Sequence, residues 1–416
     1  MPSSVTPIAP SRKWSIICLL ALGMVIAYVD RANLSVVLAL RDFKTLFHLS
    51  DVDRGLLNSA FFWSYAVLQI PAGWVVDRYG VKIPYAICFL FWSLTSAATG
   101  LVQGMGQLNS ARLLLGVGES ISTVASLRWI RCHCSENQRG LATGILFSGT
   151  KFGASAGVPI AAFLVSRFDW RTMFIILGLG GLVWLVGWFL LVKEDVAAPK
   201  RVSAAKAEIS SVTLGQMMKT PAMWGIIFGT FSYNYFIYFC LTWLPAYLVE
   251  SRHLSLTSMG IYTMFSFAGM AVIGIAAGWA ADRFISRGFE AISTRRMFTL
   301  LGFVAASTEI IGALSQSQSV SLFFALFSLS GLGLATANYW ALTQTIVPEG
   351  LIGRVVGVQN FSSNFSGIVA PILTGWLKQT TGSYHAPMFA VLGVLLLGLF
   401  SYGVLVRPSS MKAAVG

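Results

Sequence analysis

Charged side chains lie inside two of the long apolar stretches of this sequence. Asp30 and Arg31 interrupt the first stretch, and Arg112 and Glu119 interrupt the fourth. An ionised side chain at the depth of a bilayer costs from a few to about ten kcal/mol, so such groups usually face an opposite charge or a water-filled cavity. Carboxylates can carry protons and arginines can bind anions, so these residues predict a polar pathway for solutes across a membrane.

Their spacing supports one shared cavity. Arg112 and Glu119 are seven residues apart, which places them on nearly the same helix face with about 10 Å between them along the axis. The first stretch runs outward and the fourth runs inward, so Asp30, Arg31 and Arg112 reach a similar depth. We expect Arg31 and Arg112 to hold an organic carboxylate, because the guanidinium fork matches its two oxygens. The alternative is that both arginines only neutralise Asp30 and Glu119 as structural ion pairs.

Composition places the chain in a membrane. Of its 416 residues, 56% are apolar and only 11% are charged, far from the values of a soluble domain. Runs of roughly 20 residues, long enough to cross a hydrocarbon core, predict an all-α polytopic membrane protein of twelve transmembrane helices. They lie at 14–40, 55–76, 83–104, 107–131, 138–166, 170–192, 221–249, 256–281, 297–315, 318–346, 351–378 and 385–406.

The basic residues indicate the orientation. Of the 29 lysines and arginines, nineteen fall on the side of the two termini, seven fall on the other side, and Arg31, Arg112 and Lys151 lie within spans. Lys and Arg are retained in cytoplasmic loops, so both termini are expected in the cytoplasm. This asymmetry explains most of the net charge of +13. Anionic lipid headgroups of the bilayer suffice as its partner, and no nucleic-acid partner is expected.

The sequence contains an internal repeat. Gly73-Trp-Val-Val-Asp77-Arg78 recurs as Gly278-Trp-Ala-Ala-Asp282-Arg283, each time at the end of the second span of a six-span half. The repeat predicts two pseudo-symmetric six-helix bundles joined by a polar, Ala/Ser-rich cytoplasmic linker. The expected bounds are 1–192 for the first bundle, 193–220 for the linker and 221–416 for the second bundle.

The fuller first copy, Gly73-x-x-x-Asp77-Arg78-x-Gly80-x-Lys82, resembles the loop signature of the major facilitator superfamily. The resemblance implies a transporter that works by alternating access, usually as a monomer. It also implies a conformational latch, formed here by Gly73, Asp77, Arg78, Gly80 and Lys82, with Asp282 and Arg283 in the second copy. A tight turn with positively charged anchoring of the loop is the alternative interpretation of both copies.

Four further motifs are similar to those of the anion:cation symporters of this superfamily, which include hexuronate and galactonate permeases. They are Tyr28-Val-Asp30-Arg31-Ala-Asn33, Arg112-x-x-x-Gly116-x-Gly118-Glu119, Leu241-Thr-Trp-Leu-Pro-Ala-Tyr247 and Asn360-Phe-x-x-Asn364-x-x-Gly367-x-x-x-Pro371. The resemblance implies proton-coupled symport of a small organic anion, a sugar acid or another carboxylate, in a bacterial inner membrane. It also implies that Asp30 and Glu119 carry the coupled proton.

Other polar and aromatic residues can line the same cavity. Tyr65 belongs to a stripe on the second span together with Asn58, Phe62 and Gln69, and it is the best candidate there for a substrate contact. Such stripes also occur between packed helices. From the second half we expect contacts from Tyr238, Asn360 and Asn364, with Trp340 and Thr343 as weaker candidates.

Lys151 departs from the resembling sugar-acid permeases, in which a small or amide residue is usual at this position of the fifth span. It is either a third substrate-binding cation or a lysine that snorkels or pairs with Glu119. Gly149, Gly153 and Gly157 predict close packing with a neighbouring helix, but the spacing leaves open which face of the fifth span carries Lys151.

The remaining polar residues give no sign of an enzyme. Cys132-His133-Cys134 lacks a second ligand pair with zinc spacing, so no metal is expected. No Ser/His/Asp set and no phosphate-binding loop is present, and no cofactor is expected. Glu309 lies in the ninth span, which the resemblance assigns to the outer scaffold. Rival functions are an anion exchanger or facilitator without proton coupling and, less consistent with the short termini, a nutrient sensor that does not transport.

Overall fold

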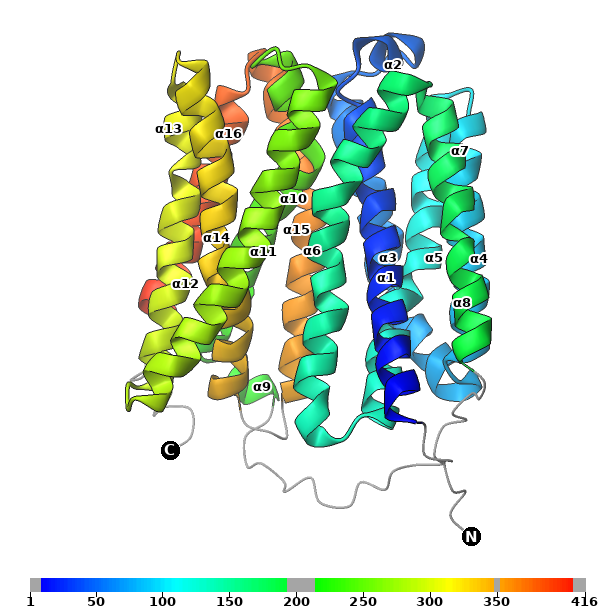
Figure 1. The fold of residues 1–416 in the computed structure, drawn as a ribbon. Helices are drawn as coiled ribbons and strands as arrows, with labels where there is room; N and C mark the ends of the chain where they lie inside the picture. The colour runs from blue at the N-terminus through cyan, green and yellow to red at the C-terminus, as the bar shows by residue number, and fades with distance from the viewer. Residues whose placement is uncertain (1–8, 193–213, 348–351, 407–416) are drawn as a thin grey trace. The chain divides into compact units, whose positions relative to one another are not determined.

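The computed structural model describes residues 9–192, 214–347 and 352–406, and all regular structure within these ranges is helical. Helices suit a bilayer because they satisfy every backbone hydrogen bond within one segment. The first part of the chain forms α1 (Pro10–Val37), α2 (Arg41–Leu46), α3 (Asp51–Tyr79), α4 (Lys82–Ala98), the 3-10 turn η1 (Thr99–Leu101), α5 (Met105–His133), α6 (Glu136–Arg167), α7 (Trp170–Gly181) and α8 (Val183–Leu191) (Figure 1).

The second part continues the pattern of long helices. It forms α9 (Leu214–Met217), α10 (Pro221–Glu250), α11 (Leu256–Ser286), α12 (Ala291–Ser307), α13 (Glu309–Leu314), α14 (Gln318–Ile346), α15 (Ile352–Thr381), α16 (His385–Phe400) and the π-helical turn η3 (Ser401–Leu405). Three of these helices begin with a side-chain cap. The hydroxyls of Thr220, Ser255 and Ser317 accept hydrogen bonds from backbone N–H groups in the first turns of α10, α11 and α14.

Each of the twelve predicted spans corresponds to one long helix or to two consecutive helical segments, so the all-α fold class is confirmed. Within the described residues, nine of these are long and apolar enough to cross a membrane by length and composition. The three that fall short, α6, α10 and α15, are rich in Gly, Ser, Asn and Tyr. These three helices carry Lys151, Tyr238, Asn360 and Asn364, four of the residues expected at the binding site.

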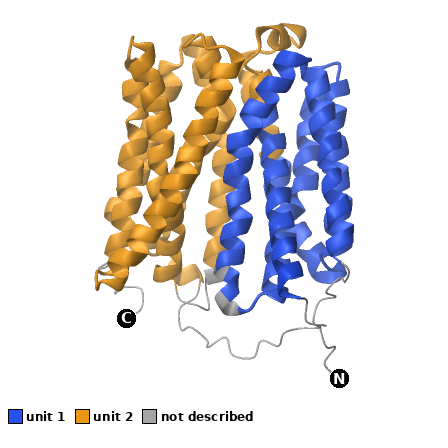
Figure 2. Ribbon diagram, in the orientation of Figure 1, with its two compact units in different colours: residues 1–33, 63–202 blue, residues 34–62, 203–416 orange. Residues whose placement is uncertain are grey.

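By contacts, the chain forms two compact units (Figure 2). Unit 1 comprises residues 1–33 and 63–202, and unit 2 comprises residues 34–62 and 203–416. The boundary expected from the repeat lies instead in the linker at 193–220, of which residues 193–213 are outside the described part. The difference arises because the segment 34–62, which includes the beginning of α3, packs against the second half of the chain through the ion pairs examined below.

Aromatic side chains form the centre of unit 1. The rings of Phe89 and Trp184 stack with centroids 4.2 Å apart, and Trp188 stacks on Trp184 at 4.9 Å. Gly118 lets α5 approach α4 closely, because a Cβ at this position would lie 2.6 Å from the Cβ of Trp92. This close packing holds fixed the face of α5 that carries Arg112 and Glu119.

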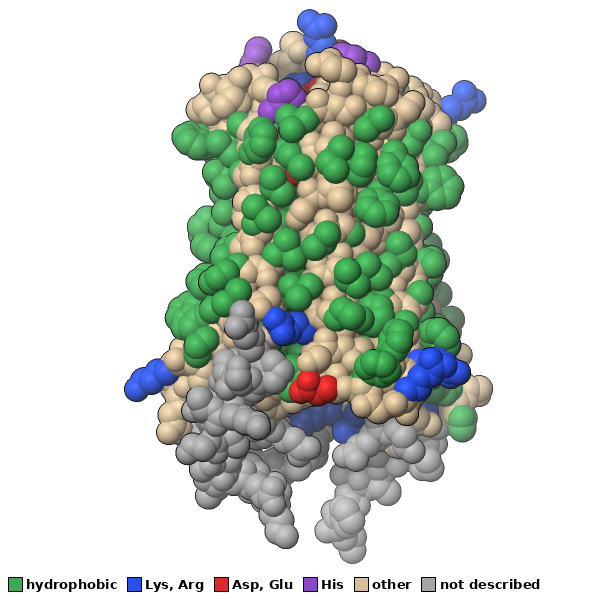
Figure 3. Space-filling model, turned by 90° about the vertical axis from the view of Figure 1, so that its left-hand side faces the viewer, with side chains coloured by type: hydrophobic (Ala, Val, Ile, Leu, Met, Phe, Trp, Pro, Cys, Tyr) green, Lys and Arg blue, Asp and Glu red, His purple; other side chains and the backbone are tan. Residues whose placement is uncertain are grey.

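The surface of unit 2 is consistent with a lipid-facing exterior. On the face shown in Figure 3, hydrophobic side chains cover the middle of the molecule, whereas charged and histidine side chains gather toward its two ends. Large apolar residues such as Val272, Ile275 and Trp279 on α11 are 66–72% exposed. A soluble protein would rarely expose so many large apolar side chains in one band.

Candidate functional site

The central contact of the site is a buried ion pair between α1 and α5 within unit 1. Arg31 Nε donates to Glu119 Oε2 at 2.7 Å, and the two side chains are 4% and 0% exposed. The sequence-based expectation placed Arg31 beside a carboxylate, and the structure identifies that carboxylate as Glu119. A buried pair of this kind offsets the cost of burying either charge alone.

Two tyrosine rings surround the same arginine. The guanidinium carbon of Arg31 lies 4.6 Å from the ring centroid of Tyr28 and 4.6 Å from that of Tyr65. Aromatic faces attract cations, and the attraction grows when water is excluded. Tyr65, predicted as a substrate contact, therefore touches the predicted anion-binding arginine. Tyr28 precedes Arg31 by three residues on α1, so a helical reading of the motif could have identified it as part of the site.

Asp30 and Arg112 extend the buried cluster. Asp30 Oδ1 accepts a hydrogen bond of 2.7 Å from Ser96 Oγ of α4. Arg112 Nη1 lies 3.4 Å from the backbone carbonyl oxygen of Asp30, which agrees with the similar depth expected for these two residues. Asp30 is 1% and Arg112 4% exposed. Nothing in the sequence distinguished Ser96 from the other hydroxyl residues of α4.

Each carboxylate in the cluster keeps one spare oxygen. Within the described residues, Asp30 Oδ2 and Glu119 Oε1 are buried and have no hydrogen-bond partner. An ionised carboxylate that lacks partners for its lone pairs is unfavourable in a buried environment, and a proton on the spare oxygen relieves this cost.

Lys151 lies on the face of α6 directed away from α1. Gly153 packs on α1, where an added Cβ would lie 2.5 Å from the carbonyl oxygen of Val25, and Gly157 meets Val29 and Ala32. Lys151 is two residues from Gly153, about 200° around the helix. Its side chain is partly exposed, and the described residues include no ion pair between Lys151 and Glu119, whose carboxylate binds Arg31 instead. The pairing of Lys151 with Glu119, one of the alternatives left open by the sequence, is thus not found among the described residues.

The predicted contacts from the second half all lie in unit 2. The Tyr238 ring packs edge-on against Phe62 with centroids 4.5 Å apart. Asn364 Nδ2 donates to the backbone carbonyl of Asn360 at 3.0 Å, one helical turn away. The weaker candidates differ in burial: Trp340 is partly exposed, whereas Thr343 is fully buried and donates to the carbonyl of Tyr339.

The two repeated loops place their aspartates in comparable pairs. Asp77 of α3 forms an ion pair with Arg128 of α5, and Asp282 of α11 pairs with Arg295 of α12 at 2.8 Å between Oδ1 and Nη2. Gly80 has φ of +82°, a conformation that favours glycine, and ends the turn before α4. Gly73 is not a point of close helix approach, because an added Cβ would meet only a Val124 side-chain atom at 3.8 Å.

The basic residues of the repeated loops lie beside tryptophans. Arg78 and Arg283 each lie over the tryptophan four residues earlier, at 5.6 Å from the Trp74 ring and 5.9 Å from the Trp279 ring. Lys82 begins α4 and accepts through its carbonyl oxygen the indole N–H of Trp188 at 2.9 Å. The sequence did not indicate Arg128 and Arg295 as partners of the aspartates. Both were included only among the nineteen basic residues expected on the same side of the membrane as the two termini.

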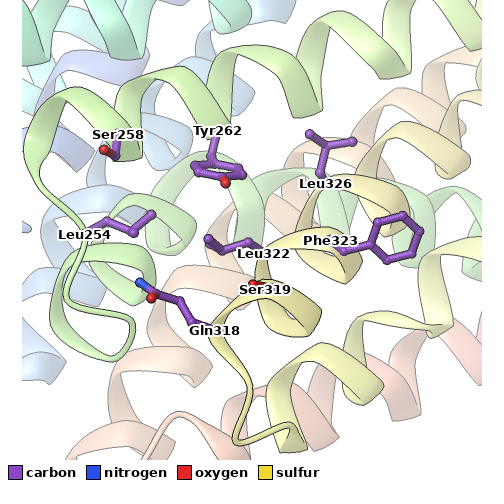
Figure 4. A pocket seen from close by; sticks show the side chains of 8 residues that line it. All are labelled: Leu254, Ser258, Tyr262, Gln318, Ser319, Leu322, Phe323 and Leu326. Carbon is purple, nitrogen blue, oxygen red and sulfur yellow. The ribbon is translucent and has the colours of Figure 1, made fainter.

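Two cavities in unit 2 lie apart from these residues. A recess of about 560 Å³ between the beginnings of α11 and α14 has no charged side chain among its lining residues, which are Leu254, Ser258, Tyr262, Gln318, Ser319, Leu322, Phe323 and Leu326 (Figure 4). A second cavity of about 20 Å³ is lined by Glu309, Cys240 and Tyr247 among others. Glu309 is thus buried beside α10. In the Cys132-His133-Cys134 motif, His133 stacks on Trp129 with ring centroids 4.3 Å apart.

The sequence matches the model of the Major Facilitator Superfamily over residues 20–371. The chain belongs to this superfamily. Within it, the relatives place the chain in the anion:cation symporter group. The hexuronate transporter of Bacillus subtilis (strain 168) is 31% identical over 411 residues, covering 97% of this chain and 96% of that one. The superfamily consists of transporters, so this chain is an integral membrane transporter and not an enzyme.

Further relatives and solved structures agree. The D-galactonate transporter of Escherichia coli O6:H1 is 28% identical over 95% of this chain and 96% of its own length. The probable galactarate/D-glucarate transporter of Escherichia coli (strain K12) is 27% identical over 94% of each chain. A bacterial homologue of the human lysosomal transporter Spinster matches with a TM-score of 0.81 and 17% identity over 97% of this chain and 99% of its own. This low identity supports the fold alone.

Proposed function

We propose that this chain is a proton-coupled symporter that carries a small organic anion, a sugar acid or another carboxylate, across a bacterial inner membrane. It works as a monomer by alternating access, with both termini in the cytoplasm; residues 1–8 and 407–416 lie outside the described part. The observation that carries the proposal is the buried Arg31–Glu119 pair beside Asp30 and Arg112. In this pair, a permanently charged arginine directly contacts an acid that can take up a proton.

Coupling follows from competition for Arg31. While Glu119 is ionised, it occupies the Nε–H of Arg31, and the buried pair is electrically neutral. A proton on Glu119 removes the negative charge, so the guanidinium can turn its donors toward a substrate carboxylate. Substrate and proton then enter together, and the neutralised site can reorient. Asp30, held by Ser96, provides the second acid.

The remaining residues recognise the rest of the substrate. Arg112 adds a second cation, and the Tyr65 ring supplies an apolar wall beside Arg31. Tyr238, Asn360 and Asn364 offer a hydroxyl and amides for substrate hydroxyl groups from the second half of the chain. The relatives are named as transporters of hexuronate, D-galactonate and galactarate/D-glucarate, so a polyhydroxy acid is the first class to test.

Lys151 makes dianions the more favourable members of that class. Arg31, Arg112 and Lys151 carry three positive charges against the two negative charges of Asp30 and Glu119. Because Lys151 lies on the face of α6 directed away from α1, it would act on a second carboxylate of a substrate that extends beyond Arg31, which favours a dicarboxylate over a monocarboxylate.

The repeated loops act as the conformational latch. Asp77 with Arg128 and Asp282 with Arg295 connect helices at the ends of α3 and α11. Gly80 provides the turn, while Arg78, Lys82 and Arg283 add positive charge beside the lipid headgroups.

Uptake into proteoliposomes tests the proposal. Purified protein is reconstituted with a pH-sensitive dye, and galactarate, D-galactonate and D-glucuronate are offered with and without an inward proton gradient. Symport predicts accumulation against a concentration gradient, with alkalinisation of the external medium. Uptake that is indifferent to the gradient identifies a facilitator, and uptake that requires an internal anion identifies an exchanger. Binding without any flux identifies a sensor; each of these results rejects symport.

A further inference from the structure

A second set of partly buried ion pairs lies in unit 2, whereas Arg31 and Glu119 lie in unit 1. It lies at the end of unit 2 where α2 is found, opposite α9 (Figure 1). We name it the Glu250 network, after the residue with the most partners. Its members are Lys44, Asp51, Arg54, Glu250, Lys378 and Tyr384.

Glu250, the last residue of α10, has four partners. Its Oε1 accepts from Lys44 Nζ at 2.6 Å and from Arg54 Nη2 at 3.0 Å. Its Oε2 accepts from Lys378 Nζ at 2.8 Å and from the Tyr384 hydroxyl at 2.7 Å. Both oxygens of the carboxylate are therefore fully used, which is the condition under which a partly buried charge is stable.

Asp51 is the second acid of the network. Its Oδ1 accepts from Arg54 Nη1 at 2.6 Å and from Lys378 Nζ at 2.8 Å. Arg54 is 1% exposed, and its guanidinium carbon lies 4.6 Å from the centroid of the Trp243 ring. The indole N–H of Trp243 in turn donates to the carbonyl oxygen of Pro371 at 3.2 Å. The Trp243 ring thus covers the Arg54 guanidinium, whereas Lys44 and Asp51 remain partly exposed.

Two glycines allow the backbones around the network to touch. A Cβ at Gly55 would lie 2.5 Å from the carbonyl oxygen of Pro371, and a Cβ at Gly375 would clash with the carbonyl oxygen of Asp51. The backbone N–H of Val52 donates to Gln379 Oε1 at 3.0 Å. The beginning of α3 is therefore pressed against α15, with no room for water or substrate between these backbones.

The ion pairs of the network are of two kinds: some join the two halves of the chain, and the others lie within one half. Lys44–Glu250, Arg54–Glu250 and Lys378–Asp51 join one half of the chain to the other. Arg54–Asp51 and Lys378–Glu250 lie within one half each. If the halves separate at this end, each acid keeps a basic partner from its own half. No carboxylate is then left buried and unpaired, which would otherwise make opening costly.

We infer that the Glu250 network is the outer gate of the transporter, and that Glu250 is a positioning residue that holds the gate closed until its cross-half partners separate. The inference rests on the proposed transport function and on the proposed orientation, which places this end of unit 2 outside the cell. The gate opens by exchange of partners: Asp51 retains Arg54, and Glu250 retains Lys378 and Tyr384.

The gate and the coupling site respond to different stimuli. Burial alone would raise the pKa of the Glu250 carboxyl, which lies just beyond the expected span 221–249, but the charge of Arg54 and the hydrogen bonds from Lys378 and Lys44 lower this pKa to about 2. A depressed carboxylate pKa stabilises the closed network at all pH values above its ordinary range, and this stabilisation is lost only as the pH falls toward 2. The protons that drive uptake therefore leave the gate ionised.

A disulfide across the gate tests the inference. In the full-length double variant Val52→Cys with Gln379→Cys, oxidation is expected to join α3 to α15 and to lower galactarate or D-galactonate flux at least tenfold, with recovery on reduction. The two single variants, treated in the same way, are the matched controls. Cross-linking is quantified by mass spectrometry. Undiminished flux through the cross-linked protein would overturn the gate; if oxidation leaves the thiols free, a short bis-maleimide joins the same two positions and the same outcomes apply, without recovery on reduction.

Glu250→Gln provides a second measurement. Weakening the closed gate should populate the outward-open state and lower the KM for external substrate about three- to tenfold. Lys44→Gln, which removes only one cross-half pair, should give a smaller change in the same direction. Glu290→Gln, an exposed acid at the start of α12, is the control. A lower maximal rate at unchanged KM would indicate a merely structural role and reject the inference.

The two proposals fail in distinguishable ways. If the reduced protein shows flux that is independent of protons, symport is wrong but the cross-link still tests the gate. If the reduced protein transports none of the organic anions offered, transport of that class is wrong. The gate alone is wrong when the reduced and the cross-linked proteins transport equally.

Discussion

Arg31 and Glu119, 88 residues apart in the chain, meet through a 2.7 Å contact between Nε and Oε2 in a part of unit 1 that is almost inaccessible to solvent. Removing one partner from a buried pair leaves an uncompensated charge, so neither residue can be replaced without consequence. In the proposed mechanism, the pair places the proton-accepting group directly on the anion-binding group. Each can be altered separately in a transport assay.

Glu119→Gln should abolish proton-driven accumulation while it preserves substrate exchange. The amide keeps the size of the side chain but cannot ionise, so Arg31 stays available for substrate and the proton step is lost. Accumulation under a pH gradient and counterflow without one are measured in proteoliposomes, and the pH dependence of uptake should weaken because one of the two proposed acids is lost. Glu290→Gln is the control. Normal accumulation by Glu119→Gln would contradict the assigned role.

Arg31→Lys should reduce uptake strongly although the positive charge remains. Lysine lacks the planar fork that can bind two carboxylate oxygens, and its compact ammonium group interacts differently with the rings of Tyr28 and Tyr65. We expect at least a tenfold lower ratio of maximal rate to KM, about 1.4 kcal/mol or more. Initial rates of galactarate and D-galactonate uptake provide the measurement, with Arg167→Lys at an exposed helix end as control. Equal rates would show that only charge matters.

Lys151→Gln should change substrate preference more than overall activity. Loss of the third cation should reduce galactarate uptake severalfold more than D-galactonate uptake, because only the dianion presents a second carboxylate. Competition between the two labelled substrates gives the ratio directly. An unchanged ratio would leave Lys151 with a structural role.

Gly153→Ala should destabilise the protein, whereas Gly144→Ala on the same helix should not. A Cβ at Gly153 would lie 2.5 Å from the carbonyl oxygen of Val25, so α1 and α6 must move apart; a Cβ at Gly144 meets nothing within 4 Å. Overpacking of this kind costs about 1–3 kcal/mol, and alanine is favoured over glycine in an exposed helix position. Thermal unfolding in detergent compares the two variants. Equal melting temperatures would contradict the packing described here.

Asp77→Asn should slow transport without much loss of stability. The pair with Arg128 is solvent-exposed, with 69% of the Asp77 side chain accessible, so the free energy of unfolding should change by less than about 1 kcal/mol. A latch nevertheless stabilises one of the two transport conformations and not the other. Its loss should therefore lower the maximal transport rate severalfold. Thermal unfolding and initial uptake rates are measured on the same preparation. Unchanged transport would favour simple anchoring of the loop.

The sequence predicted the helices and the buried acids and arginines well, because both follow from the cost of polar groups in a bilayer. Every expected span has its helix, although 170–192 and 297–315 are each divided into two helical segments, at Leu182 and Thr308. The similar depth of Asp30 and Arg112 followed from helix geometry alone. Helix geometry alone did not show which acid would bind Arg31, because that choice depends on how α1 and α5 are rotated against each other.

Other features could not be derived from a single sequence. The glycines of α6 indicated close packing but not the identity of the neighbour, so the face that carries Lys151 became known only when α1 was located. Lys44, Arg54 and Lys378 looked like ordinary loop charges, because nothing in their local sequence shows that Glu250 lies among them. The ion pairs of the repeated aspartates with Arg128 and Arg295 depend on tertiary packing in the same way.

These two pairs also carry a consequence for the internal repeat of the chain. The duplicated aspartate has kept its place in each copy, yet in the first half it reaches two long helices ahead, to α5, and in the second half only to the next one, α12. The repeated motif thus places its aspartate in both copies, but it does not determine which helix supplies the partner arginine. A hybrid protein built from two first halves would therefore repeat the motif without reproducing the native connections of the second half.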